Sequence, residues 1–169
     1  MLKILGRFML AGALVVVPAT GFAQREKISN DLSKCSGGAG PAVMVQVKGF
    51  KQASGRVRVQ SYEATSAKWL KKGQWINRIE VPAVARGKTV SVCVPLPAPG
   101  SYGIAVRHDM DGNGKSGWND GGGFSGNPDI SLLNLKPSAN KSAITVGQGV
   151  TRISVVLNYR EGTKIEPLD

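Results

Sequence analysis

The sequence has few of the side chains that catalyse reactions. Among its 169 residues are one histidine, two cysteines and eleven aspartates and glutamates. It contains neither a Gly-x-Ser-x-Gly nucleophile elbow nor a zinc-protease motif, and it has no close pair of carboxylates outside one loop. These absences leave little machinery for hydrolysis, so we predict that the protein is not an enzyme.

Apolar stretches long enough to cross a membrane are also lacking. The one long apolar run, residues 8–17, follows a basic start, is broken by Pro18 and is too short to span a bilayer comfortably. Small residues up to Ala23 complete the pattern of a cleaved signal peptide. We therefore expect residues 1–23 to be a signal peptide, the mature chain to be periplasmic or secreted, and no transmembrane segment to remain. The alternative is a retained membrane anchor.

Acidic residues are few: the 22 lysines and arginines outnumber the 11 aspartates and glutamates two to one, which gives a formal net charge of +11. Removal of residues 1–23 takes away Lys3 and Arg7 and no acid, which leaves +9. Such a charge favours an anionic cell-envelope component as a partner, such as lipopolysaccharide, anionic lipid or an acidic polysaccharide. No nucleic acid is expected as a partner of an exported protein. The alternative is a solvated basic surface that keeps the protein soluble.

The two cysteines are Cys35 and Cys93. In an exported chain they predict one disulfide, and the alternative is a pair of buried free thiols. In the alternating run 89–94 the valines share the face that we expect to be buried, whereas Cys93 has the opposite parity. This parity predicts a bridge to an arm that lies over the sheet, not a bridge through the core.

Alternation of apolar and polar residues predicts β-strands over most of the remaining chain. The expected strands are residues 42–48, 56–60, 76–84, 89–94, 102–108, 143–146 and 150–159. A polar N-terminal arm at residues 24–41 and a flexible C-terminal tail at residues 161–169 are expected to flank a single domain at residues 42–160. Short alternating runs at this spacing are typical of an all-β Greek-key β-sandwich of about seven strands.

One short helix is expected at residues 64–72, where Gly73 supplies a stop. Trp69 would pack this helix on the sheet, and Trp75 follows closely. Together with Trp118, these aromatic side chains could form a ligand platform for a glycan. The alternative is that they fill the core.

The most informative stretch is HDMDGNGKSGWND, at residues 108–120. Its spacing is that of an EF-hand calcium loop, in which Gly114 permits the sharp turn. In one register five residues supply the oxygens that calcium prefers: Asp109, Asp111, Asn113, Lys115 through its main-chain carbonyl, and Asp120. The absence of clustered cysteine or histidine argues against zinc. The alternative is a glycine-rich turn in which Asp and Asn cap their own backbone without any metal.

His108 stands immediately before this loop, on the face of its strand that we expect to be buried. We interpret it, with Gly114, as a brace for the loop, because a histidine in such a place normally has hydrogen-bond partners. Alternatively, His108 and Asp109 could serve a metal-assisted hydrolase. At the other end of the strand, Tyr102 follows a proline-rich corner and predicts a hydrogen-bonded tyrosine corner.

Three stretches carry a resemblance to a known family: GSYGIAVRHDMDGNGK, GGFSGN and RISVVLNY. With them the chain resembles the bacterial domain-of-unknown-function family 2141 over residues 42–159. The resemblance implies a small exported β-sandwich of the immunoglobulin or transthyretin type and implies no activity. Between Ser116 and Gly122 this sequence departs from the family pattern, with glycine, Trp118 and Asn119 where the family has an apolar residue, proline and glutamate.

These observations favour an exported binding or structural module with a calcium-stiffened loop. A module that binds carbohydrate or an envelope polymer is the first alternative, and a metal-assisted hydrolase is the second.

Overall fold

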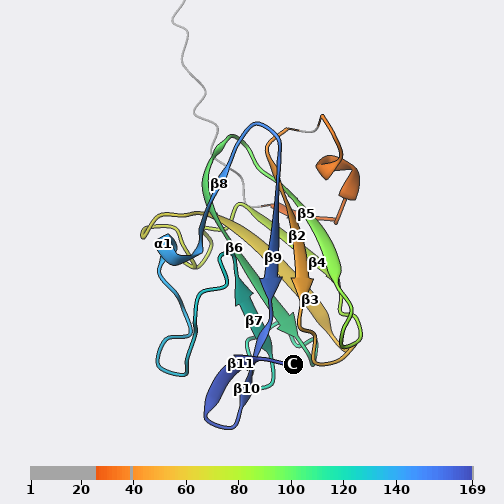
Figure 1. The fold of residues 1–169 in the computed structure, drawn as a ribbon, viewed down its shortest axis with the longest axis vertical. Helices are drawn as coiled ribbons and strands as arrows, with labels where there is room; N and C mark the ends of the chain where they lie inside the picture. Colours follow the sequence, from red (N-terminus) through yellow and green to blue (C-terminus); the bar gives the residue numbers. More distant parts are fainter. Residues whose placement is uncertain (1–25, 39, 169) are drawn as a thin grey trace, which may run out of the picture.

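The structure is a computed structural model that describes residues 26–38 and 40–168, so the expected signal peptide lies outside the described residues. The described chain folds into two β-sheets packed face to face (Figure 1). In the part of the chain that the structure describes, no helix is long and apolar enough to span a membrane. The prediction of an all-β sandwich is confirmed.

The larger sheet has eight strands. They are β1 (Glu26–Ile28), β3 (Arg56–Glu63), β4 (Asn77–Pro82), β6 (Gly100–Asp109), β7 (Gly121–Phe124), β8 (Ala143–Val146), β10 (Asn158–Glu161) and β11 (Lys164–Pro167). The main path runs in the order β1-β4-β3-β6-β7-β10-β11, and β8 pairs with the first half of β6. The smaller sheet has the order β5-β2-β9, with β2 (Ala42–Lys48) between β5 (Val90–Pro95) and β9 (Val150–Val156).

Alternation along the strands builds the core between the two sheets. Val43, Val45 and Val47 on β2 are fully buried, as are Val57 and Val59 on β3. Burying one such side chain stabilises the fold by about 1.5–3 kcal/mol. The polar residues between them point outward, as the period of two predicts.

The predicted strand at residues 150–159 is in fact two strands in different sheets. β9 pairs with β2 in parallel, whereas β10 pairs with β7 and β11. Leu157 lies between them, and its N–H donates to the Lys48 carbonyl at 2.9 Å. The buried alternation continues through Val155, Leu157 and Tyr159, so the pattern gives no sign of the change of sheet.

The two edge strands of the larger sheet come from the segments that we predicted as a polar arm and a flexible tail. β1, from the N-terminal arm, pairs in parallel with β4, and β11 pairs antiparallel with β10. The expectation of a flexible tail at residues 161–169 is therefore wrong for β11, and the polar arm contributes a strand that the sequence did not predict. A strand left at an edge exposes a row of unpaired N–H and C=O groups, and each short strand satisfies one such row.

The helix expected at residues 64–72 does not form. One turn closes where the Trp69 N–H donates to the Thr65 carbonyl at 2.8 Å, and Leu70 then adopts a φ of +53°. A left-handed residue cannot continue a right-handed helix. The buried Trp69 indole donates instead to the Pro137 carbonyl at 2.8 Å, which fixes the turn against another loop. The short helix of the fold is α1 (Ala139–Ser142), before β8.

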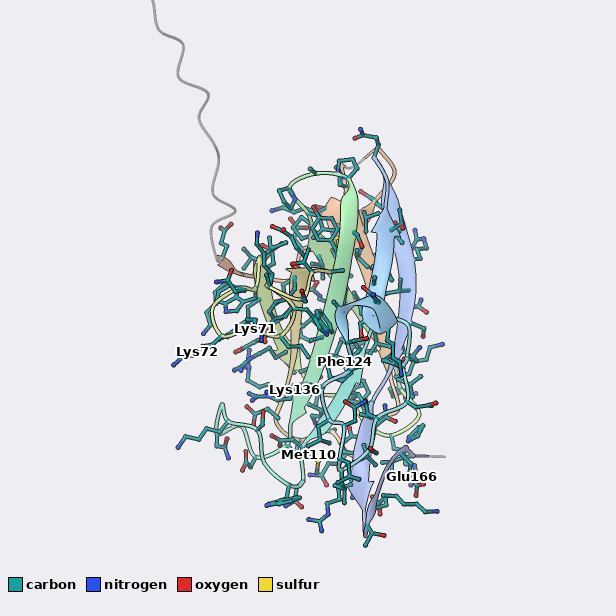
Figure 2. The ribbon with its side chains drawn as sticks, turned by 90° about the vertical axis from the view of Figure 1, so that its left-hand side faces the viewer. Lys71, Lys72, Met110, Phe124, Lys136 and Glu166 are labelled. Atoms are coloured by element: carbon teal, nitrogen blue, oxygen red, sulfur yellow. A yellow bond between two sulfur atoms is a disulfide. The ribbon has the colours of Figure 1, made fainter. Side chains whose placement is uncertain are left out.

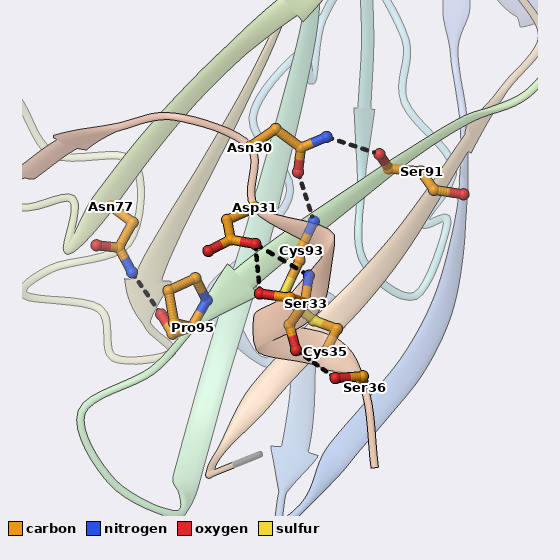
Figure 3. The surroundings of a disulfide bond; sticks show 9 residues. All are labelled: Asn30, Asp31, Ser33, Cys35, Ser36, Asn77, Ser91, Cys93 and Pro95. Atoms are coloured by element: carbon orange, nitrogen blue, oxygen red, sulfur yellow. Dashed lines mark hydrogen bonds between the residues drawn. A yellow bond between two sulfur atoms is a disulfide. The ribbon is translucent and has the colours of Figure 1, made fainter. Parts of the chain in front are cut away.

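Cys35 and Cys93 form the predicted disulfide, with their Cα atoms 5.7 Å apart (Figure 3). Cys35 ends the 3₁₀ helix η1 (Leu32–Cys35), which packs against β5. Beside it, the Asn30 amide donates to the Ser91 carbonyl and accepts from the Cys93 N–H, both at 3.0 Å. Cys93 has the outward parity and is nevertheless buried, because this arm covers it. The disulfide is consistent with an extracytoplasmic location.

Candidate metal centre

The strand β6 positions the acidic loop. It begins at the proline-rich corner, where the Tyr102 hydroxyl donates to the Ala98 carbonyl at 2.8 Å, which confirms the predicted tyrosine corner. It ends at Asp109 and pairs with β7, where His108 of β6 lies opposite Gly121 of β7. Asp109 and Asp120 therefore stand at the two ends of a hairpin loop whose strands are already hydrogen-bonded.

Three of the predicted ligands come together. One carboxylate oxygen each from Asp109, Asp111 and Asp120 lies within 4.8 Å of the other two. Asp109 is only 4% exposed, whereas Asp111 is exposed and Asp120 is half-buried. The cluster thus has a buried floor and an open side, which is an arrangement that can admit a small cation.

Main-chain donors orient the two carboxylates at the loop ends. Asp120 accepts from the Met110 N–H at 3.1 Å and from the Gly117 N–H at 2.8 Å. Asp109 Oδ2 accepts from the Gly114 N–H at 2.9 Å, and Gly114 reaches this place with a φ of +78° that favours glycine. The Gly114 N–H therefore links the middle of the loop to Asp109 at its start.

The other oxygen of Asp109, Oδ1, is buried and has no hydrogen-bond partner among the described residues. A buried carboxylate oxygen without a partner is costly, because its lone pairs have lost water and gained nothing. A buried atom without a partner needs an explanation, and an ion bound at that oxygen would provide one.

Asn113 and Lys115, the other two predicted ligands, bond within the loop. The Asn113 amide nitrogen donates to Asp111 Oδ2 at 2.5 Å, and its oxygen accepts from the Lys115 N–H at 2.6 Å. The Asn113 N–H also donates to Asp111 Oδ1 at 3.0 Å. These bonds shape the turn that carries Asp111, as the turn interpretation expects of Asp and Asn.

Arg107 is the residue that the sequence analysis missed. Its guanidinium donates to Asp109 Oδ2 at 3.1 Å and to the Ser116 hydroxyl at 3.1 Å. Because Arg107 and Asp109 are two apart on one strand, their side chains share a face. The alternation of side chains along a strand could therefore have identified this pair, although alternation does not specify the side-chain rotamers that bring the two charges together.

His108 braces a different turn from the one expected. Its Nε2 lies 2.7 Å from the Ser54 carbonyl and its Nδ1 lies 2.6 Å from the Tyr159 hydroxyl. A carbonyl only accepts, so Nε2 carries a proton and, in a neutral ring, Nδ1 accepts from the hydroxyl. Both nitrogens are engaged away from the carboxylate cluster. Burial raises the pKa of Tyr159 to about 12.

The three tryptophans do not form one platform. Trp69 is buried with Tyr62 in a small cluster, and the partly buried Trp75 packs against that cluster beneath the Arg78 guanidinium. Trp118 is 72% exposed on the acidic loop, and the guanidinium of Arg160 lies 4.3 Å from the centre of its ring. Trp69 therefore has the core role that was left open as the alternative.

Comparison with known proteins gives a family and no activity. No curated protein and no solved structure matches the chain. A family model matches residues 45–154, which extend from β2 into β9 and include the whole acidic loop. The chain thus belongs to the DUF2141 family, which is described as an uncharacterized protein conserved in bacteria.

Proposed function

We propose that this protein is an exported β-sandwich module whose acidic loop binds calcium. The observation that carries the proposal is the buried, unpartnered Oδ1 of Asp109 beside the carboxylates of Asp111 and Asp120. A bound cation would supply the partner that this oxygen lacks. Export is supported by the Cys35–Cys93 disulfide, which persists in oxidising compartments, and by the signal-peptide pattern of residues 1–23.

Electrostatics favours a divalent cation in the cluster. Two like charges about 4 Å apart repel by roughly 1 kcal/mol in water and by roughly 4 kcal/mol near a protein surface. Arg107 offsets part of the repulsion with a single positive charge, 3.1 Å from Asp109. The three carboxylates outnumber that charge, so a cation with two charges would bring the cluster close to balance.

The donor set favours calcium among divalent cations. The cluster offers carboxylate oxygens, which are hard ligands, and contains neither cysteine nor histidine, which zinc prefers. Magnesium demands a near-ideal octahedron, whereas calcium accepts irregular geometry from a flexible loop. The resulting role is structural, because calcium would tie the exposed Asp111 to the two fixed ends of the hairpin.

Thermal unfolding with and without calcium tests the proposal. With a dissociation constant of about 10⁻⁴ M, about 1 mM calcium stabilises the fold by about 1.4 kcal/mol through mass action. The melting temperature should then rise by about 3–6 °C. The same concentration of magnesium should have a smaller effect.

Asp111→Ala is the decisive variant, because Asp111 is exposed and alanine removes both of its oxygens, whereas asparagine would keep one that can bind calcium. It should keep the fold and lose the calcium-dependent rise. Asp129→Ala is the matched control, since Asp129 is an exposed acid outside the cluster. If calcium leaves the wild-type melting curve unchanged, or raises the melting temperature equally in all variants, the loop is only a turn and does not bind calcium.

A further inference from the structure

The outer face of the larger sheet contains a cavity of about 370 Å³ beside the acidic loop. This size lies within the range of about 300–1,000 Å³ that is typical of small-molecule sites. Figure 2 looks onto this side of the molecule, where Phe124 and Lys136, both lining residues, are drawn close together. The cavity is separate from the carboxylate cluster, although Asp120 borders both.

The register of the strands explains why this face is hollow. On the outer face, Arg58 lies opposite Arg107, and Arg107 lies opposite Gly122. A Cβ built on Gly122 would meet only the Val106 carbonyl oxygen, at 3.9 Å, so the space above it is open. The next row contains the small Ala105 opposite Phe124. A glycine and an alanine in adjacent rows leave room that larger side chains would fill.

Aliphatic side chains wall this hollow. Leu70 lies on one side, Ile165 of β11 on another, and the loop after β7 adds three more residues: Ile130, Leu132 and Leu135. Leu135 is 50% exposed, although burying it would be favourable. Neutral polar groups are few, and the Asn158 amide nitrogen already donates to the carbonyls of Gly122 and Val156. Trp118 also lines the cavity, with the Arg160 guanidinium over its ring, so the walls are mainly apolar and suit an alkyl chain.

The charged residues of the lining complement an anion. Arg58 pairs with Glu80 at 2.7 Å and Arg107 pairs with Asp109 at 3.1 Å. Lys136 and Arg160 also line the cavity, and no carboxylate among the described residues lies within ion-pair distance of either. Arg160 already donates through Nε to the Gly162 carbonyl at 2.9 Å and lies over the Trp118 ring, so Lys136 is the charge that is most open to a ligand. Asp120 is the one carboxylate in the lining, against four cationic side chains.

We propose that this cavity binds a single-chain amphiphilic carboxylate of the fatty-acid type. The alkyl chain would lie over Gly122 and Phe124, between the leucines and isoleucines of the wall. The carboxylate would lie toward Lys136 and Arg160 at the rim. The proposal does not depend on calcium, and its test is run in a chelator so that the two can fail separately.

Isothermal titration calorimetry of the purified mature protein with decanoate in EDTA tests this site. Decanoate should bind saturably at one site, and acetate, which has the head group without the chain, should not bind measurably. Decyl glucoside has the chain with a neutral sugar head and should bind at least fivefold more weakly. Equal or tighter binding of decyl glucoside, or no saturable binding of decanoate, would overturn the proposal.

Gly122→Leu should fill the cavity and weaken decanoate binding at least tenfold. Gly122 does not have a positive φ, so a side chain is compatible with its backbone. Leu135→Asp is a second variant that needs no repacking, because it places an anion at the exposed rim. Its matched control is Leu133→Asp, since Leu133 is fully exposed on the same loop and does not line the cavity. Equal affinity of these two aspartate variants for decanoate would show that decanoate does not bind in this cavity.

Lys136→Gln should weaken decanoate binding by roughly two- to fivefold, because an exposed ion pair contributes modestly to affinity. Lys88→Gln, an exposed lysine outside the lining, should leave affinity unchanged. Cooperative thermal unfolding of each variant verifies that it is folded. A Lys136→Gln variant that binds decanoate as tightly as the wild type would show that the carboxylate of the ligand does not contact Lys136, contrary to the proposal.

Discussion

At the scale of residues, a hydrogen-bonded chain of polar groups ties three distant segments together. The Tyr159 hydroxyl accepts from the Lys51 N–H at 3.2 Å and donates to His108, whose other nitrogen donates to Ser54. His108 and Tyr159 are each at most 1% exposed. Every donor in this chain has an acceptor, so the core accommodates a histidine and a tyrosine without an unpaired proton.

This arrangement predicts a loss of stability in alkali. An unfolded tyrosine ionises near pH 10, whereas burial raises the pKa of Tyr159 to about 12. The stabilising contribution, about 3 kcal/mol, is therefore complete below about pH 10 and is lost as the pH rises toward 12. Urea unfolding midpoints between about pH 8 and 11 measure it.

Tyr159→Phe is the comparison for that titration. It should cost about 1–3 kcal/mol at neutral pH, because the Lys51 N–H and His108 Nδ1 lose their partner. Its midpoint should then fall less than that of the wild type between pH 10 and 11. Parallel curves for the two proteins would show that Tyr159 is not the group responsible.

At the scale of elements, the turn after β2 determines how the acidic loop begins. The Ser54 hydroxyl donates to the Met110 carbonyl at 3.1 Å, immediately after Asp109. Gly55 adopts a φ of +72°, and a Cβ on it would lie 1.9 Å from the Asp109 carbonyl oxygen. The two turns therefore meet backbone to backbone, which only glycine allows.

Gly55→Ala should accordingly be among the most destabilising single changes in the fold. We expect a cost above about 3 kcal/mol, since both the left-handed conformation and the contact with backbone oppose the new methyl group. Gly87→Ala is the matched control, because Gly87 has a φ of +77° and open space around it. It should cost only about 1–2 kcal/mol. Equal unfolding free energies for the two variants, measured in urea, would contradict the packing argument.

At the scale of the whole molecule, the N-terminal arm is fastened to the sandwich in two ways. β1 extends the larger sheet beside β4, and Cys35 bridges to Cys93 on the smaller sheet. The arm thus spans the two sheets along one side of the molecule (Figure 1). Its covalent link closes a loop with a sequence separation of 58 residues, which restricts the unfolded chain.

Removal of the disulfide should lower stability substantially. The double variant Cys35→Ala and Cys93→Ala should lose about 4 kcal/mol, which corresponds to a fall in melting temperature of about 8–16 °C. Calorimetry of wild type and variant measures the difference. Reductant should destabilise the wild type to a similar extent and leave the double variant unchanged. A variant as stable as the wild type would show that β1 alone fastens the arm.

Local patterns in the sequence predicted the features that depend on near neighbours. Alternating valines on β2 and β3 predicted which faces are buried, because a strand turns successive side chains to opposite sides. The spacing of Asp109, Asp111 and Asp120 predicted that their carboxylates would meet, and main-chain donors within the loop hold Asp109 and Asp120 in place. The tyrosine corner at Tyr102 and the parity of Cys93 were predicted in the same way.

Contacts between distant segments decided the rest. The Trp69 indole donates to the Pro137 carbonyl, within a turn that the sequence favoured as a helix. β11 pairs with β10, where the sequence indicated only a flexible tail. The change of sheet at Leu157 and the hollow above Gly122 leave no local trace, because each depends on which strand lies alongside. Alternation specifies the face that a side chain takes, whereas the partner across that face exists only once the chain has folded.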